Sequence, residues 1–380
     1  MRKNYLYHIR WITIILVVIF HIYFYYNNID LDTKAMFAGA PAYDGTKTFA
    51  GLYQYLVYPW FMILLFVVAG ISARIALKTK TNKEFMRARV DKVLVPSTLG
   101  ILAFGWIGGY IIYISQAKVN SPEPIPKVVG VFITLFSGTG ALWFCQVLFV
   151  AVLVLMLLRL CINRGRRNDD SACQWFEKIL HSPIAFTLGM IILYLLYWGC
   201  SNILNMPVVT SYRMGIYTVA FLSGFYIFSN DSLIDKLKKA VPVTFLLAVA
   251  SGIFYIWRCY GKAYTKITVL ERWDLNLYAF IMVLLILGAG ARWANGSNRF
   301  TQYMCKCCFG IYVFHIPVLL VTNYLLSKVS LPLTAVYWIE LISALVCSLI
   351  LYEIIRRIPI LRYWILGIRS KKRIKDKKTV

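Results

Sequence analysis

Apolar segments of about 20 residues follow one another along this chain, and each is long enough to cross a bilayer as a helix. Hydrophobic residues make up 60% of the 380 and charged residues only 15%, whereas soluble domains carry about 25% charged residues. We therefore predict an all-α, polytopic membrane helix bundle. Ten spans are expected near residues 9–27, 52–77, 93–116, 140–162, 182–200, 212–229, 240–257, 274–291, 303–327 and 332–356.

The net charge of +25 comes from basic residues that cluster in alternate loops. By the positive-inside rule these loops face the cytoplasm, together with both termini of a multi-pass protein of the cell membrane. The charge follows this loop pattern and no nucleic-acid-binding motif accompanies it, so nucleic acid is not an expected partner. We expect a membrane domain over residues 1–360 and a basic cytoplasmic tail over 361–380. The first span has no small-residue cleavage site after it and is expected to be retained.

Lys127 to Gly138 is too short to cross a bilayer and too apolar for a free loop. Non-helical or partial crossings are tolerated where protein buries them. This segment is therefore expected to be re-entrant or to lie at the membrane interface.

The first apolar run is bracketed by Arg10 and His21. Eleven residues at about 1.5 Å each place these two side chains about 16 Å apart along a helix, roughly half of a hydrocarbon core of about 30 Å. Ionisable groups at that depth are costly and mark functional sites, and histidine readily accepts a proton near neutral pH. His21 is the candidate general base. A packing histidine and an Arg10 that only anchors the helix at the interface are the alternatives.

Arg87, Arg89 and Lys92 stand immediately before the third expected span, whose first turn contains Pro96. The positive-inside rule explains basic residues in this loop, but it does not require three of them at the membrane edge. Cations gathered there suit a phosphorylated ligand through charge-assisted hydrogen bonds. A nucleotide-bearing acyl carrier is such a ligand.

Two further ionisable residues fall inside expected spans. His315 is followed by Pro317, which removes a backbone donor and can open a polar pocket. Glu340 is the clearest buried acid, as a proton relay, as a partner of Arg213 or of a histidine, or as a neutral side chain. The cysteines at 305, 307 and 308 lack a second ligand pair at metal spacing, so no metal is expected.

Three classes of function remain open on these residues. An enzyme would use the buried histidines, a transporter or flippase of lipid-linked saccharides would use the spans and their ionisable groups, and a membrane scaffold would leave the Arg10–His21 spacing without a role. No phosphate-binding loop, dinucleotide fingerprint, nucleophile elbow or HExxH motif is found, so nothing supports an ATPase or hydrolase. No internal repeat supports the transporter.

Four motifs, in order, resemble the membrane acyltransferase-three family of O-antigen and exopolysaccharide O-acetylases and glucan succinyltransferases. They are Arg10 with His21, the stretch Leu64–Pro96 (LLFVVAGISARIALKTKTNKEFMRARVDKVLVP), Leu142–Phe144 (LWF) and Gly310–Pro317 (GIYVFHIP). The Ala-Gly-Ile-Ser stretch is most similar to the glucans biosynthesis protein C-like branch.

Two positions depart from the family pattern. Tyr7 stands where relatives often carry Asp, and Lys92 completes an Arg-x-x-Lys where relatives often carry Arg-x-x-Arg. Lysine keeps the charge but loses bidentate phosphate contacts. The SGNH hydrolase-like extension of some relatives is also missing, so transfer is expected within the membrane domain or through another protein.

The resemblance implies an acyl-CoA-dependent transferase that moves an acetyl or succinyl group to a hydroxyl of a cell-envelope glycan. It implies that the donor phosphates contact Arg10, Arg87, Arg89 and Lys92, and that His21 is the general base. His315 and Tyr312 would orient His21 or stabilise the oxyanion. Acyl-CoA, the glycan acceptor and membrane lipid are the expected partners.

Overall fold

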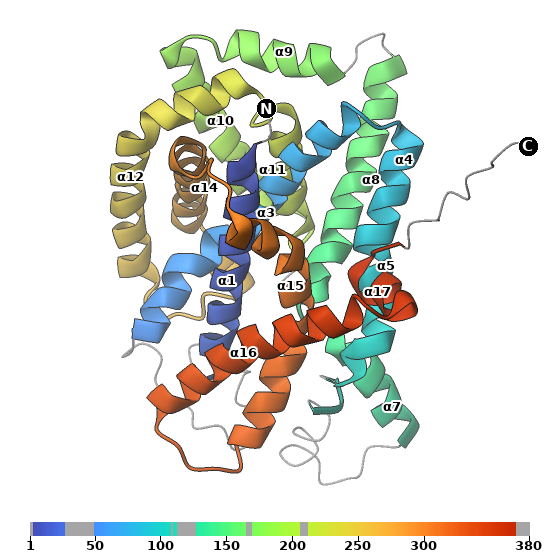
Figure 1. The fold of residues 1–380 in the computed structure, drawn as a ribbon. Helices are drawn as coiled ribbons and strands as arrows, with labels where there is room; N and C mark the ends of the chain where they lie inside the picture. The colour runs from blue at the N-terminus through green and yellow to red at the C-terminus, as the bar shows by residue number, and fades with distance from the viewer. Residues whose placement is uncertain are drawn as a thin grey trace, which may run out of the picture.

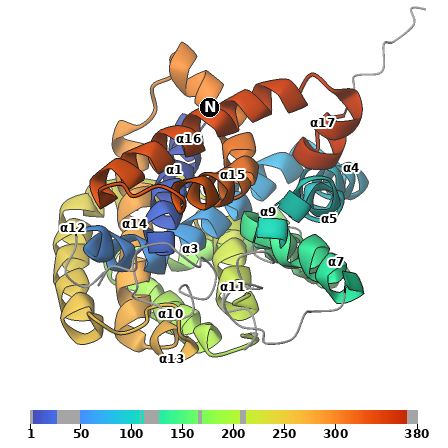
Figure 2. The ribbon, with the colours of Figure 1, turned by 90° about the horizontal axis from the view of Figure 1, so that it is seen from below.

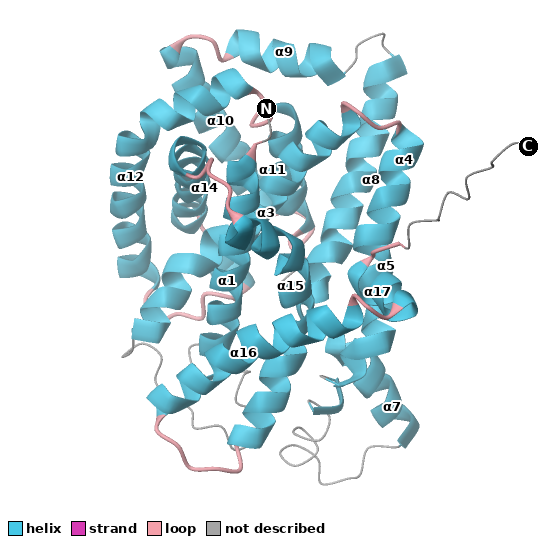
Figure 3. Ribbon diagram, viewed as in Figure 1, coloured by secondary structure: helices cyan, strands magenta, loops and turns pink. Residues whose placement is uncertain are grey.

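The computed structural model describes residues 3–26, 49–107, 109–111, 127–164, 169–205 and 212–369, and no β-strand occurs in these ranges (Figure 3). The α-helices are α1 (Asn4–Tyr26), α3 (Phe49–Leu77), α4 (Asn82–Arg89), α5 (Val95–Gly100), α7 (Lys127–Phe136), α8 (Trp143–Arg164), α9 (Asp169–Ile179), α10 (Pro183–Ser201), α11 (Met214–Tyr226), α12 (Asp231–Cys259), α13 (Ile267–Leu270), α14 (Trp273–Trp293), α15 (Arg299–Leu326), α16 (Leu333–Ile355) and α17 (Pro359–Leu366). Two π-helical stretches, Val90–Leu94 and Ile101–Gly105, flank α5, and a 3-10 stretch, Ser137–Leu142, precedes α8.

Eight helices in the described ranges are long and apolar enough to span a membrane, so the expected count of ten is not confirmed. They are α1, α3, α8 with the end of the preceding 3-10 stretch, α10, α12, α14, α15 and α16. The expected third span, 93–116, is broken into short α and π segments and leaves the described residues after Ile111. The expected sixth span is α11, an apolar helix of 13 residues, and 13 residues rise only about 20 Å.

Hydrogen-bonding side chains set several helix starts. Thr81 and Glu84 form a reciprocal capping box at the start of α4, and Asn298 and Thr301 do the same for α15. Ser182 caps α10, which begins with Pro183 in the first turn, where its missing N–H costs nothing. These caps fix where the loops end and where the apolar spans begin.

The bundle is arranged around α3, which packs against α11, α1 and α14 (Figures 1 and 2). The α3–α11 contact is close because Gly70 and Gly224 face the partner backbone. A Cβ at Gly70 would lie 2.0 Å from the Phe221 carbonyl oxygen, and one at Gly224 would lie 2.2 Å from that of Val67. Small residues at helix contacts are how membrane helices bring their backbones together.

The outside of the bundle is apolar and much of its polar content is inside. Helix α12 presents Phe245, Ile253 and Trp257 to the surroundings, whereas Gln54 and His315 are fully buried. This distribution reverses that of a soluble protein and is the one that a bilayer favours. The chain is therefore a multi-pass membrane protein.

The last described helix, α17, lies beside α5 and crosses the expected domain boundary at residue 360 (Figure 2). Its Ile365 and Leu366 are buried. The start of the segment expected as a basic tail is therefore packed on the bundle, while the basic residues from 370 onward lie outside the described residues. The short segment 127–138 is helical over α7, with Val128 and Phe132 exposed.

Candidate active site

Helices α1 and α15 pack together and bring two histidines into contact. The Nε2 atom of His315 lies 3.3 Å from Nδ1 of His21, although the two residues are 294 positions apart. His315 is fully buried, whereas His21 is only half-buried. One histidine of the pair is therefore reachable and the other supports it from the interior.

Backbone carbonyls assign the proton positions of both rings. A carbonyl oxygen only accepts hydrogen bonds, and Nδ1 of His21 lies 2.8 Å from the Val17 oxygen while Nδ1 of His315 lies 2.8 Å from that of Tyr312. Both neutral rings therefore carry the proton on Nδ1. Nε2 of His315 then accepts from His21, and the lone pair on Nε2 of His21 is left to act as a base.

Tyr312 lies beside the histidine pair, but its hydroxyl bonds to a residue outside the pair. Its ring centroid is 5.9 Å from that of His315, and its hydroxyl donates to the carbonyl oxygen of Ala141. Phe144, from the Leu-Trp-Phe motif, packs against the Tyr312 ring. Tyr312 thus orients His315 through its backbone oxygen and joins α15 to the start of α8.

Arg10 lies on the same face of α1 as His21. Eleven residues at about 100° each amount to three turns plus about 20°, so the two side chains project in nearly the same direction, about 16 Å apart along the axis. Arg10 donates from Nη2 to the hydroxyl of Ser72 at 3.2 Å. Ser72 belongs to the Ala-Gly-Ile-Ser stretch, which gives that motif a structural role.

Arg89 and Lys92 lie within electrostatic range of Arg10 at this end of α1, and we call these three residues the cation cluster. Burial and the nearby Arg10 lower the pKa of the Arg89 guanidinium. The pKa of Lys92 is lowered by burial, then by Lys80 and by the two arginines of the cluster. Groups that repel one another in this way form a site for an anion. Arg87 is exposed on α4, and no described contact joins it to the cluster.

Glu340 is buried on α16, within electrostatic range of Tyr25, which lies one turn beyond His21 on α1. The rings of Tyr23 and Tyr337 meet nearby, with centroids 5.0 Å apart. Arg213, considered as its partner, donates to the carbonyl oxygen of Leu270. Glu340 is thus placed near the α1 end that carries His21.

An ion-pair network was missed in the sequence, where its basic residues were explained by topology alone. Asp169 on α9 pairs with Arg159 at 2.6 Å and with Arg74 at 3.7 Å, and Arg159 also donates to Asn82 at the start of α4. The adjacent acids Asp169 and Asp170 in a basic surrounding were the available signal. Helix α9 lies across the end of the bundle at which α1 begins (Figure 1).

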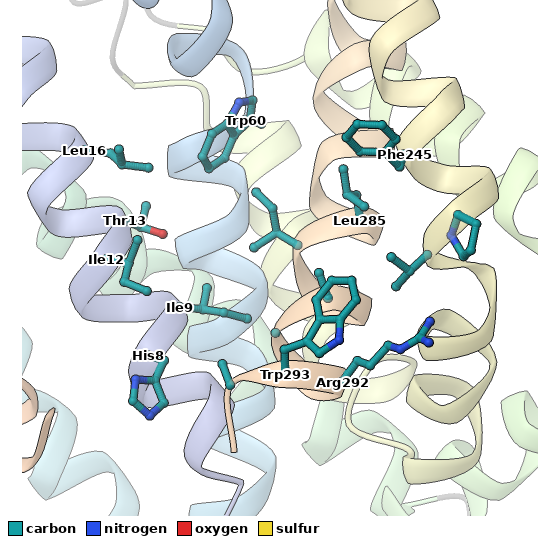
Figure 4. Close-up of a pocket in the computed structure, with 16 residues that line it drawn as sticks. His8, Ile9, Ile12, Thr13, Leu16, Trp60, Phe245, Leu285, Arg292 and Trp293 are labelled. Carbon is teal, nitrogen blue, oxygen red and sulfur yellow. The ribbon is translucent and has the colours of Figure 1, made fainter. Parts of the chain in front are cut away.

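An apolar groove of about 700 Å³ lies between α1, α12 and α14 (Figure 4). It is lined by Ile9, Leu16 and Phe245, with Arg292 and Trp293 at one end. On α1 these lining positions are turned about 120° away from Arg10 and His21. The groove is therefore separate from the histidine pair.

Comparison with known proteins gives the family of the chain. The model of the acyltransferase 3 family, described as an acyltransferase domain, matches residues 3–353. Glucans biosynthesis protein C of Escherichia coli O1:K1 / APEC is 22% identical over 339 residues, 86% of each chain, and so is that of Shigella boydii serotype 4 (strain Sb227). No solved structure matches this chain.

The fold is that of a multi-pass membrane protein in which His21 contacts the buried His315, and the cation cluster lies about 16 Å away along α1. The family match covers nearly the whole chain. The chain belongs to the acyltransferase 3 family and is a membrane acyltransferase.

Proposed function

We propose that the protein transfers an acetyl or succinyl group from acyl-CoA to a hydroxyl of a cell-envelope glycan, with His21 as general base. The observation that carries this is the position of His21 on the same face of α1 as Arg10 of the cation cluster, with no hydrogen bond to its Nε2 from the residues that the structure describes. The name of the glucans biosynthesis relatives supports a glycan acceptor. The basic loops support an orientation in the cytoplasmic membrane with both termini inside.

The donor would bind with its phosphates on Arg10, Arg89 and Lys92. Guanidinium and ammonium groups form short, charge-assisted hydrogen bonds with phosphate oxygens. The extended pantetheine arm of CoA is long enough to cover the roughly 16 Å to His21. The thioester would then lie at mid-membrane, next to the histidine pair.

In the transfer, Nε2 of His21 removes the proton of the acceptor hydroxyl while that oxygen attacks the thioester carbonyl carbon. The tetrahedral intermediate collapses as the carbon–sulfur bond breaks. The CoA thiolate leaves and takes the proton back from His21. Throughout, Nε2 of His315 accepts from Nδ1–H of His21 and stabilises the transient imidazolium. Glu340 lies near enough to Tyr25 to belong to an acceptor-side relay.

The test uses inverted membrane vesicles given acetyl-CoA or succinyl-CoA labelled in the acyl group. We expect the wild type to pass label to envelope glycan, the His21→Ala and His21→Gln variants to lose transfer, and the preferred donor to identify the acyl group. The exposed His181 gives the matched control, His181→Ala. Full transfer by His21→Ala at normal protein levels would disprove the role of His21, and no transfer from either CoA ester by the wild type would disprove the donor.

A further inference from the structure

An acidic residue stands between two members of the cation cluster in the sequence. Asp91 is buried, precedes Lys92 directly and is two residues from Arg89. Its charge acts on Lys92, since it raises the pKa that burial and the neighbouring cations lower. A carboxylate in this position can compete with a phosphate for the same cations.

Residues of α17 and the segment directly after it bind this carboxylate. Nη2 of Arg369 lies 2.6 Å from Oδ1 of Asp91, and the hydroxyl of Tyr363 donates to the same oxygen at 3.1 Å. The Arg369 guanidinium also lies over the Tyr363 ring, 5.7 Å from its centroid. The partners of Asp91 therefore come from the segment after α16, 272 and 278 residues along the chain.

The backbone around Gly367 holds Arg369 in place. Gly367 ends α17 with φ of +63°, and the N–H of Ile368 returns to the Arg362 oxygen, as in a glycine C-cap. A Cβ at Gly367 would lie 2.2 Å from the carbonyl oxygen of Asp91. The segment is thus pressed against the backbone of Asp91 itself, which lies in the π-helical stretch Val90–Leu94. Such stretches recur at functional sites.

We infer that Arg369, held by α17, is a positioning residue that binds Asp91 and keeps the cation cluster free for the phosphates of the acyl donor. This inference rests on the proposed donor site. Without Arg369, the Asp91 charge is no longer compensated and pairs with Lys92. The donor is then held less tightly, while the chemistry at His21, about 16 Å further along α1, is unchanged.

The experiment measures the dissociation constant of coenzyme A for the purified full-length protein in nanodiscs, with donor KM and kcat beside it. For Arg369→Gln we expect the dissociation constant and KM to rise roughly tenfold at unchanged kcat. The double variant Asp91→Asn/Arg369→Gln restores the charge balance, so both values should return to within about threefold of wild type. Arg356→Gln breaks an exposed pair with Glu353 and is the matched control.

The outcomes separate the inference from the donor site on which it rests. If the wild type does not bind coenzyme A, the donor site and the inference both fail. If Arg89→Gln loses binding but Arg369→Gln binds as wild type, only the inference fails. If the double variant stays as weak as Arg369→Gln, Arg369 contacts the donor directly or α17 is merely structural, and relief of Asp91 is disproved. Equal thermal unfolding midpoints of the variants exclude misfolding.

Discussion

At the scale of single residues, the two histidines of the pair differ in exposure: His21 is half-buried and His315 is fully buried. The Nδ1–H of His21 donates to the Val17 carbonyl oxygen and to Nε2 of His315, so the lone pair of His21 is on its Nε2. His315 has no exposed surface and is fixed by Tyr312. We therefore assign proton transfer to His21 and its orientation to His315.

Replacement of His315 tests this division. The His315→Ala variant should lose roughly 100-fold in kcat, because His21 loses the acceptor that stabilises its imidazolium, while donor KM stays unchanged. His315→Gln keeps an acceptor oxygen and should lose less. Steady-state kinetics in vesicles measure both. Equal losses in the two variants, or a rise in KM alone, would contradict the assignment.

We expect Lys92 to make binding of the proposed donor sensitive to alkaline pH. Its lowered pKa means that its positive charge, present at neutral pH, is lost at a lower pH than that of an exposed lysine. Coenzyme A affinity should therefore be complete below this pKa and fall as the pH rises through it. Lys92→Arg stays charged throughout. Titration calorimetry from neutral pH to about pH 10 should show the fall only in the wild type, and identical profiles would refute it.

At the scale of helices, ion pairs from α9 join several helices at the end of the bundle where the cation cluster lies, and we call this arrangement the α9 clamp. Its Asp169 joins Arg74 of α3 to Arg159 of α8, and Arg159 in turn holds Asn82 of α4. The helix that leads into Arg89 and Lys92 is thus anchored at its first residue. The network therefore holds the helix that leads into the proposed donor site.

The clamp predicts a stability effect. Asp169→Asn leaves the buried Arg159 without a carboxylate, whereas Arg74 keeps Asp170, and should lower the free energy of unfolding by about 3 kcal/mol. Asp235→Asn breaks an exposed pair with Lys238 and should change it by less than about 0.5 kcal/mol. Thermal unfolding in detergent compares the midpoint temperatures of the two variants. Equal midpoints would show that the ion pairs of α9 do not stabilise the bundle.

At the scale of the whole molecule, α15 is long enough to connect the two sides of the membrane. Its 28 residues extend about 42 Å, more than the hydrocarbon core of about 30 Å. The loop before it, at Ser297, should therefore be on the opposite side of the membrane from the loop after it, at Ser330.

Cysteines introduced at these two exposed positions test the arrangement. A membrane-impermeant thiol reagent should label Ser330→Cys in intact cells and Ser297→Cys only in inverted vesicles, given the positive-inside orientation. The unsubstituted protein, with its native cysteines, gives the background. Labelling of both from one side would overturn the proposed topology.

The sequence predicted what depends on composition and on position along one helix. Apolar length predicted the membrane bundle, and Arg10 with His21 could be paired because eleven residues on a helix determine their separation. The residue pattern alone did not predict which distant side chains meet. Only the family resemblance implied that His315 lies near His21. The pairing of Arg369 with Asp91 and the ion pairs of Asp169 depend on helix packing and were not predicted. Helix α11 was overestimated because its apolar run continues past the end of the helix.

Because Arg10 and His21 lie on one continuous helix, substitutions between them and insertions or deletions between them should have different effects. Substitutions between them alter side chains, but one inserted residue would turn His21 by about 100° and move it about 1.5 Å. The number of residues between Arg10 and His21 thus sets both their separation along α1 and their relative direction. Exchange of one apolar residue for another of similar size between positions 10 and 21 should therefore keep the separation of the two side chains, whereas any in-frame insertion or deletion there should abolish transfer.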